Sequence, residues 1–381
     1  MDIREITRTY LYPLATMCST IIGIGIFALP YVAVKVGLPV MFLYLAVMTT
    51  LVTIVHVMFA ELALNTPDYK RLAGFAKIYL GQWGRDIAII SNIIGFFGIM
   101  VGFMVIGGQF LFEFVGPLFG GPEVLYSFMY FFAGVALIYY GINLVSRVGL
   151  WGLAIFFLIF AVLAMKGTPY FHSVNLEANI GTIKDIFLPY GAVLFSMWAS
   201  SSIPEVEEML GRRNAKGALK SIIVASSVIA LVTYVLFIIL IAGITGAGTT
   251  ESAFIGLKSV LGDGATTLFF LFGLVTSFTS FIIVGLSLKR ILVYDMKMDK
   301  NVAWALIAIV PVILFLSGFR KFIDIFSLVG GVLLGLDGVL ILLMYQKLRP
   351  KKKWLTVSLM LVFVVGMVYE IFYYLINNGA L

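Results

Sequence analysis

The chain has 381 residues, of which 61% are hydrophobic and only 12% are charged, with a formal net charge of +7. Because soluble globular proteins carry roughly twice this charged fraction, the composition excludes an ordinary soluble domain and predicts an all-α membrane protein. No nucleic-acid partner is expected, since basic loops on the cytoplasmic side of a membrane explain the positive charge.

Eleven apolar segments are long enough to cross the bilayer, whose hydrocarbon core needs about 20 residues of helix. No cleavable signal peptide is evident at the start of the chain. We predict one transmembrane domain over residues 1–381, surrounded by the lipid bilayer. The segments run approximately over Tyr10–Val36, Leu38–Leu64, Asp86–Val115, Val124–Ile142, Val148–Met165, Ile183–Ile203, Ala218–Ile244, Gly264–Ile291, Val302–Ser317, Ile323–Tyr345 and Trp354–Ile376.

The basic residues predict the orientation of these segments. If the N-terminus is cytoplasmic, most Lys and Arg fall in the cytoplasmic loops, as the positive-inside rule requires. The one long hydrophilic excursion, residues 166–184, then becomes an external loop. The sequence therefore predicts a multi-pass plasma-membrane protein with its N-terminus in the cytoplasm and its C-terminus outside.

The first segment is interrupted at the depth where a continuous helix would be most stable. Gly23, Gly25 and Pro30 lie within the stretch STIIGIGIFALP. Backbone groups freed by a helix break are costly in a bilayer unless they line a protein cavity or hold a ligand. Freed N–H groups attract a carboxylate and freed carbonyls attract a cation, which suggests a site for a zwitterion. The alternative is that the glycines serve only helix packing. The candidate substrate-binding residues are Thr20, Gly23, Ile24 and Gly25.

The sixth segment has the same character as the first. Small and polar residues at mid-depth, FSMWASSSIPE, are again followed by a proline, Pro204. Two similar halves with five helices each are antiparallel, which is typical of inverted-repeat transporters. We predict one repeat over about residues 10–165, a second over about 183–345, and an additional helix over about 354–376. The candidate substrate-binding residues in the sixth segment are Phe195, Ser196, Trp198, Ala199 and Ser200.

Several motifs resemble a known family. Gly23–Pro30, GIGIFALP, resembles the G-x-G-I-x-x-L-P signature of the amino acid–polyamine–organocation superfamily. Phe59–Pro67 is similar to the AEL…P motif of helix 2, and Tyr79–Arg85 resembles the start of helix 3 in the amino acid/auxin permease branch. Trp198 and Glu205 resemble a helix 6 motif of arginine/agmatine exchangers, with altered spacing. The resemblance implies the fold of the bacterial leucine transporter: a five-plus-five inverted repeat with discontinuous helices 1 and 6 and the amino acid between helices 1, 3, 6 and 8.

The eighth segment carries hydroxyl groups near its midpoint. Thr276, Thr279 and Ser280 stand at i, i+3 and i+4 and share one helix face. The resemblance implies that they face the carbonyls of Ser19 and Ile22, which together would make an oxygen-only sodium site. Hydroxyls that bond only to their own helix are the alternative. Apart from Na⁺ as a coupling ion, no cofactor is expected.

Titratable groups inside the segments are candidates for proton coupling or gating. Asp337 lies within the tenth segment, where a charge is costly unless it faces a cavity or a partner, and a hydrogen bond to a neighbouring helix is the alternative to a coupling role. Glu61 lies near the cytoplasmic end of the second segment, where it would either pair with loop Lys or Arg residues as an inner gate or be an interfacial charge that reaches water. His56, alone in the same segment, is more often a packed, hydrogen-bonded core residue than a functional one.

These features predict a symporter of neutral amino acids that works by alternating access, driven by a sodium or proton gradient. A receptor-like protein that binds an amino acid at the same breaks without net transport remains the alternative. An enzyme is not expected, because the sequence has no metal-binding, nucleotide-binding or nucleophile motif and only one cysteine, Cys18.

Overall fold

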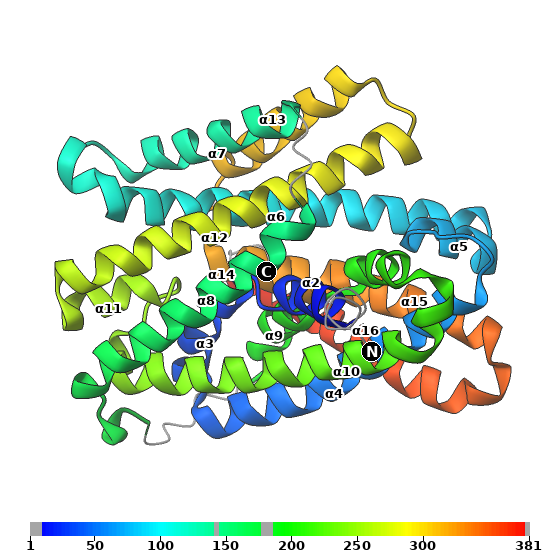
Figure 1. Cartoon of the computed structure of the whole chain (residues 1–381), viewed down its shortest axis with the longest axis horizontal. Coiled ribbons are helices and arrows are strands. Elements are labelled where there is room, and N and C mark those ends of the chain that lie inside the picture. Colours follow the sequence, from blue (N-terminus) through cyan, green and yellow to red (C-terminus); the bar gives the residue numbers. More distant parts are fainter. Residues whose placement is uncertain (1–9, 141–144, 177–185, 378–381) are drawn as a thin grey trace.

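The computed structural model describes residues 10–140, 145–176 and 186–377, and this part of the chain is almost entirely helical (Figure 1). The long helices run roughly along the longest axis of the molecule. The α-helices are α2 (Tyr12–Ile21), α3 (Leu29–Val36), α4 (Leu38–Asn65), α5 (Leu72–Leu80), α6 (Gln82–Phe119), α7 (Glu123–Tyr140), α8 (Val145–Gly167), α9 (Pro189–Met197), α10 (Ile203–Thr245), α11 (Phe254–Leu261), α12 (Asp263–Arg290), α13 (Lys300–Leu316), α14 (Phe322–Leu328), α15 (Gly335–Leu348) and α16 (Lys353–Asn377).

Within the described residues, eight helices are long and apolar enough to cross a membrane, and the bent pair of α2 and α3 makes a ninth span. This confirms the predicted all-α membrane protein. Two predicted segments are shorter in the structure. The sixth is divided between α9 and the beginning of α10, and the ninth corresponds to α13, an apolar helix of 17 residues.

The first span is broken at Gly23 and Gly25, as the sequence predicted. α2 ends at Ile21, a 3-10 turn covers Ile24–Phe27, and α3 begins at Leu29. The two helical parts are bent by 42°. Gly23 at the break has an extended backbone (φ −104°, ψ −153°). Pro30 lies in the first turn of α3, where its missing N–H costs no helical hydrogen bond.

The sixth span is broken in the same way. α9 ends at Met197, Trp198 and Ala199 leave the helical conformation, and α10 begins at Ile203 after a 3-10 turn. Helical backbone then continues to residue 210, beyond the predicted end at Ile203, because Gly211, with φ of 67°, is the first position that departs from the helix. The predicted start at Ile183 lies outside the described residues.

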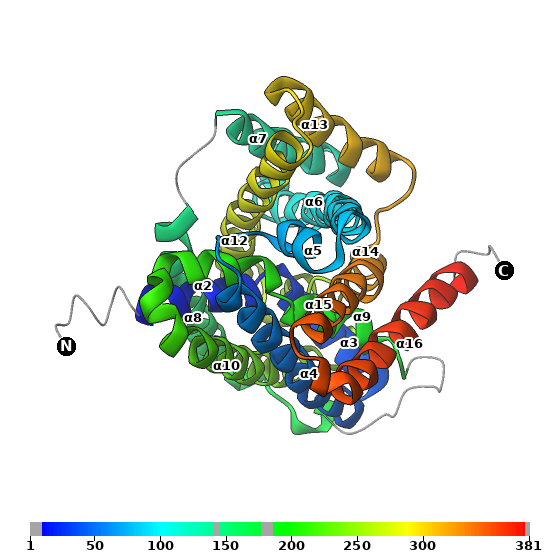
Figure 2. The same cartoon turned by 90° about the vertical axis from the view of Figure 1, so that its right-hand side faces the viewer.

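The central helix of the molecule is α6. Viewed from the end in Figure 2, it lies between α7, α12 and α13 on one side and α14 and α15 on the other, and it contacts all five. α4 and α10 pack against each other and against the two broken helices, α4 on α9 and α10 on α2 and α3. The breaks are therefore enclosed by continuous helices.

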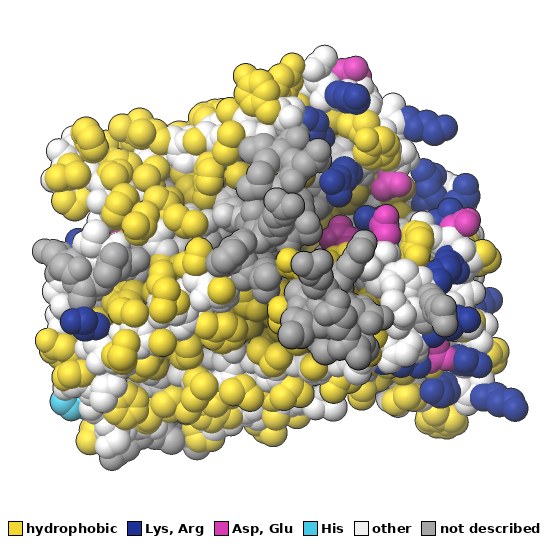
Figure 3. All heavy atoms as spheres, viewed as in Figure 1, with side chains coloured by type: hydrophobic (Ala, Val, Ile, Leu, Met, Phe, Trp, Pro, Cys, Tyr) yellow, Lys and Arg dark blue, Asp and Glu magenta, His cyan; other side chains and the backbone are white. Residues whose placement is uncertain are grey.

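Positive charge gathers at one end of the molecule, at the right of Figure 3. Loops that the sequence predicted to be cytoplasmic meet there: Arg71 pairs with Glu205 at 3.7 Å, and Arg85 donates to the carbonyl of Asp295 at 3.0 Å. We call this the basic end. Exposed basic residues in these loops include Arg71, Lys77, Lys216, Lys220, Lys347, Arg349, Lys351, Lys352 and Lys353.

Candidate functional site

A cavity of about 260 Å³ lies where the two broken helices meet α6, α8, α12 and α15. It brings together most of the residues that the sequence predicted, from four separate parts of the chain. The predicted residues that line it are Ser19, Thr20, Ile22, Gly23, Ile24, Gly25, Phe195, Ser196, Trp198, Ser200, Thr276, Thr279, Ser280 and Asp337.

Two predicted site residues lie elsewhere. Ala199 is not among the residues that line the cavity, and its backbone N–H donates to Nε2 of His56. Glu61 lies at the basic end, within a network of polar contacts described below.

The first break leaves backbone carbonyls without their helical donors. The N–H of Gly23 donates to the carbonyl of Ile21 at 2.8 Å and not to that of Ser19. Further along, the N–H of Ile26 donates to Gly23, so the carbonyl of Ile22 also lacks its usual donor. Ser19 and Ile22 supply the two carbonyls expected in the sodium site, and both residues line the cavity.

The hydroxyls of α12 lie on the same cavity as these carbonyls. Thr279 donates to the carbonyl of Val275 at 2.8 Å within its own helix. Thr276 and Ser280 have no hydrogen-bond partner in the described part of the chain, and both line the cavity. The cavity is thus lined by carbonyls without helical donors and by free hydroxyls, which are hard oxygen ligands of the type that alkali cations prefer.

The second break is stabilised by a histidine. Nε2 of His56, on α4, accepts the backbone N–H of Ala199 at 3.3 Å, and His56 has no exposed surface. Because Nε2 accepts, the neutral imidazole carries its proton on Nδ1. The His56 ring also packs against Trp198, with centroids 5.2 Å apart. The expectation of a packed, hydrogen-bonded histidine is therefore correct, and its partner is the broken helix.

Tyr234 on α10 connects the two breaks. Its hydroxyl lies 2.5 Å from the carbonyl oxygen of Ile21 and 2.8 Å from that of Ser196, and the residue is fully buried. One phenolic proton is thus shared between two carbonyls that belong to different broken helices. Sequence reasoning missed this residue, because a tyrosine in an aromatic-rich apolar helix gives no local signal.

A carboxylate lies at the end of the cavity toward the basic end. Ser91 on α6 donates to Oδ1 of Asp337 at 3.0 Å and also approaches the carbonyl of Leu333 at 3.1 Å. Asp337 is only 3% exposed. No Lys, Arg or His lines the cavity among the described residues, so the carboxylate has no cationic partner there.

Much of the cavity wall is apolar, with both aliphatic and aromatic side chains. On the opposite side of the breaks, Phe27 of the 3-10 turn packs against Phe110 and Phe254 with ring centroids 5.5 and 5.0 Å away. These buried rings close the side away from the basic end. The apolar side chains lining the cavity include Phe96, Ile99, Phe103, Phe156 and Phe195.

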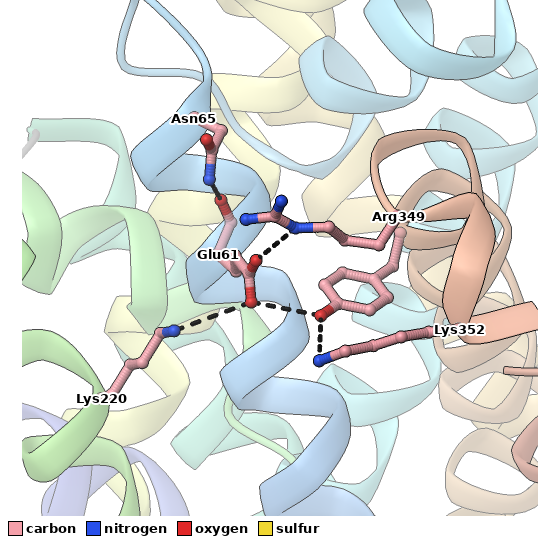
Figure 4. A network of polar contacts seen from close by, with 6 residues as sticks. Glu61, Asn65, Lys220, Arg349 and Lys352 are labelled. Atoms are coloured by element: carbon pink, nitrogen blue, oxygen red, sulfur yellow. Dashed lines mark hydrogen bonds and ion pairs between the residues drawn. The ribbon is translucent and has the colours of Figure 1, made fainter. Parts of the chain in front are cut away.

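Glu61 is the centre of a network at the basic end (Figure 4). Its carboxylate accepts from Nε of Arg349 at 2.8 Å and from the hydroxyl of Tyr345 at 3.1 Å, and Nζ of Lys220 lies 3.6 Å away. Lys352 donates to the same tyrosine hydroxyl at 3.2 Å. The predicted pairing of Glu61 with loop cations is confirmed, and it joins α4 to α10 and to the end of α15.

Comparison with known proteins gives a family for this arrangement. The sequence profile of the tryptophan/tyrosine permease family matches residues 8–373. A curated relative, tyrosine-specific transport system 1 of Haemophilus influenzae, is 24% identical over 304 residues, which cover 75% of this chain and 73% of the relative. This family match is more specific than the motif resemblance to the superfamily.

Solved structures of transporters share the fold. MhsT, crystallised with L-phenylalanine, aligns over 93% of this chain and 98% of its own, with a TM-score of 0.70 and 14% identity. A manganese transporter of Eremococcus coleocola covers 99% of this chain and 94% of its own, with a TM-score of 0.65 and 15% identity. Mhp1, a nucleobase-cation-symport-1 transporter, covers 96% of this chain and 90% of its own, with a TM-score of 0.61 and 14% identity.

Proposed function

Because this chain belongs to the tryptophan/tyrosine permease family, we propose that it is a secondary active symporter of aromatic amino acids. The chain is a transporter and not an enzyme, as its family membership indicates. The observation that carries the substrate assignment is the cavity itself. It joins backbone carbonyls freed at the first helix break, which suit the ammonium group of an amino acid, to apolar side chains including Phe96, Phe103 and Phe156, which suit its ring.

The proposed transport cycle alternates access between the two sides of the membrane. Toward the basic end the cavity is lined by α2 and by the half of α6 that begins near Arg85, whereas buried rings around Phe27 close the other side. We assign the basic end to the cytoplasm by the positive-inside rule. The network around Glu61 lies at this end and would act as part of the inner gate, whose contacts are formed in this conformation.

The remaining topology follows from the same proposal. Eleven helices would span the plasma membrane, counting α9 with residues 203–210 as one broken span and α13 as another span. Helices 1–5 and 6–10 would form the two inverted repeats, with the two breaks in equivalent positions. The N-terminus would be cytoplasmic and the C-terminus outside.

Sodium is the proposed coupling ion. Within the described residues, the carbonyls of Ser19 and Ile22 lack their helical donors and the hydroxyls of Thr276 and Ser280 have no partner, and all four residues line one cavity. A proton is the second candidate, because Asp337 is a buried carboxylate on the same cavity whose only polar contact in the described chain is Ser91. Either ion would drive uptake of the amino acid through its gradient across the membrane.

The experiment is uptake of labelled tyrosine or tryptophan into proteoliposomes containing the purified chain. We expect accumulation driven by an inward sodium gradient and lost in the Thr276→Val/Ser280→Ala variant. Accumulation driven only by a pH gradient would assign the coupling to a proton. Binding of tyrosine without uptake under any gradient would favour the receptor-like alternative and contradict the symporter.

A further inference from the structure

We propose that Asp337 selects substrates with a polar hydrogen on the aromatic ring: it accepts the phenol O–H of tyrosine or the indole N–H of tryptophan. Ser91 is a positioning residue that holds the carboxylate. This inference rests on the proposed function, because it requires an aromatic amino acid in the cavity. It adds a specific discrimination, against phenylalanine, which has no such hydrogen.

The packing of α9 gives the level of Asp337 relative to Phe195. A Cβ added to Gly330 would lie 2.8 Å from Cβ of Phe195, which is in the last turn before the break in α9. Gly330 belongs to the π-helical turn Val329–Leu334, and Asp337 lies in the first turn of α15, which follows directly. Asp337 therefore lies beyond the level of Phe195, in the direction of Arg349 and the basic end.

The cavity lining offers the kinds of group that tyrosine and tryptophan require. Backbone groups of the first break, apolar side chains such as Phe96 and Ile99, and the pair Ser91 and Asp337 all line it. Tyrosine and tryptophan carry matching groups: a zwitterion, an apolar ring, and one polar atom at the edge of the ring.

Asp337 has acceptor capacity that the protein does not use. A carboxylate offers about four acceptor positions. In the described chain only the Ser91 hydroxyl contacts it, at Oδ1, although the residue is 3% exposed and lines the cavity. Asn92, the neighbouring polar residue, donates to the carbonyl of Ala88 at 2.8 Å. A donor on the ligand would satisfy the carboxylate in a place where water is restricted.

This geometry predicts discrimination by an unsatisfied acceptor. A site built to bond a ring O–H or N–H rejects the analogue without it more strongly than an apolar pocket rejects a difference in size. Phenylalanine would leave the carboxylate without its partner and would displace any water that served instead. We therefore expect tyrosine and tryptophan to bind at least about tenfold more tightly than phenylalanine.

The test is equilibrium binding of tryptophan, tyrosine and phenylalanine to the purified full chain at one pH, with no gradient. Asp337→Asn keeps the shape of the side chain but can replace the free acceptor with an N–H₂ donor. Tryptophan, whose indole N–H only donates, should lose the most affinity, about tenfold or more. Tyrosine should lose less, because its oxygen can also accept, and phenylalanine should be unchanged.

Two further variants control this result. Ser91→Ala should lower the ratio of tryptophan to phenylalanine affinity in the same direction but by less, and it keeps the inference testable if Asp337→Asn fails to fold. Asp86→Asn removes an exposed carboxylate from the same helix as Ser91 and should leave all three affinities unchanged. An equal loss for all three ligands in Asp337→Asn, or equal affinities in the wild type, would overturn the inference. Absence of binding by all three to the wild type would instead refute the proposed function.

Discussion

The two helix breaks look alike in sequence but differ in how their freed backbone groups are satisfied. At the first break, the carbonyls of Ser19 and Ile22 lose their helical donors and remain open beside the cavity. At the second break, the N–H of Ala199 is bonded by His56 and the carbonyl of Ser196 by Tyr234. The first break thus keeps groups available for a ligand, whereas the second is largely completed by the protein itself.

This difference indicates that the two breaks have different roles. Both breaks cost free energy in a membrane, where an unpaired polar group is expensive. A break whose groups are satisfied by side chains is stable without ligand and can serve as a fixed frame. A break with open carbonyls gains its partners when substrate or ion binds, so its conformation depends on the ligand.

The largest expected effect comes from the glycines of the first break. A Cβ on Gly25 would lie 2.5 Å from Oγ and 3.0 Å from Cα of Ser196, whereas on Gly23 its nearest neighbour is the carbonyl of Thr20 at 3.6 Å. We expect Gly25→Leu to abolish tyrosine binding, and Gly25→Ala to destabilise the protein by about 1–3 kcal/mol. Gly23→Ala should remain folded with weakened binding. Thermal unfolding measures the stability of each variant, and equilibrium binding measures its affinity for tyrosine. Equal destabilisation by Gly25→Ala and Gly23→Ala would contradict the tighter packing around Gly25.

The second effect tests whether His56 stabilises the other break. His56→Leu leaves the buried N–H of Ala199 without an acceptor, and we expect a loss of about 1–3 kcal/mol in unfolding free energy. His56→Gln supplies an acceptor oxygen and should recover part of this loss. Thermal unfolding without ligand is the measurement. Equal stability of the leucine and glutamine variants would show that the hydrogen bond contributes nothing.

Tyr234→Phe should have a smaller effect on stability, because water has two O–H groups and can serve both carbonyls in the vacated space. The connection between the two breaks is nevertheless lost, so we expect a raised KM for uptake, with stability lowered by about 1 kcal/mol. Tyr130→Phe is the matched control, since this buried tyrosine packs against Phe278 and Phe281 instead of the breaks. An unchanged KM in Tyr234→Phe would argue against coupling of the breaks.

The smallest expected effect is on the network around Glu61. Arg349 is about half exposed, and Arg349→Ala should change the unfolding free energy by at most about 1 kcal/mol. If the network closes an inner gate, Arg349→Ala should raise the rate at which substrate is exchanged across the liposome membrane. Lys77→Ala removes an exposed lysine of the basic end that forms no ion pair in the described chain, and its exchange rate should match the wild type.

The sequence predicted the positions of both breaks because their signals are local: glycines and a proline in the first, and small polar residues followed by a proline in the second. It also predicted that Ser19, Thr276 and Ser280 share a site, because the superfamily resemblance relates helices 1 and 8. The sequence did not predict which side chains bond to the second break. His56 and Tyr234 act through helices distant in sequence, and their roles depend on how α4 and α10 pack. The contact between Ser91 and Asp337 joins α6 to α15 for the same reason.

The central claim is that the open groups of the first break bind an aromatic amino acid together with a cation. The most direct measurement is the thermal stabilisation of the purified protein by tyrosine or tryptophan, in sodium or in choline, at two pH values. We predict an increase in Tm that is larger in sodium and loses its sodium dependence in Thr276→Val/Ser280→Ala. An increase in Tm that depends on pH and not on sodium would assign the coupling to a proton on Asp337. No shift with any aromatic amino acid would contradict the claim.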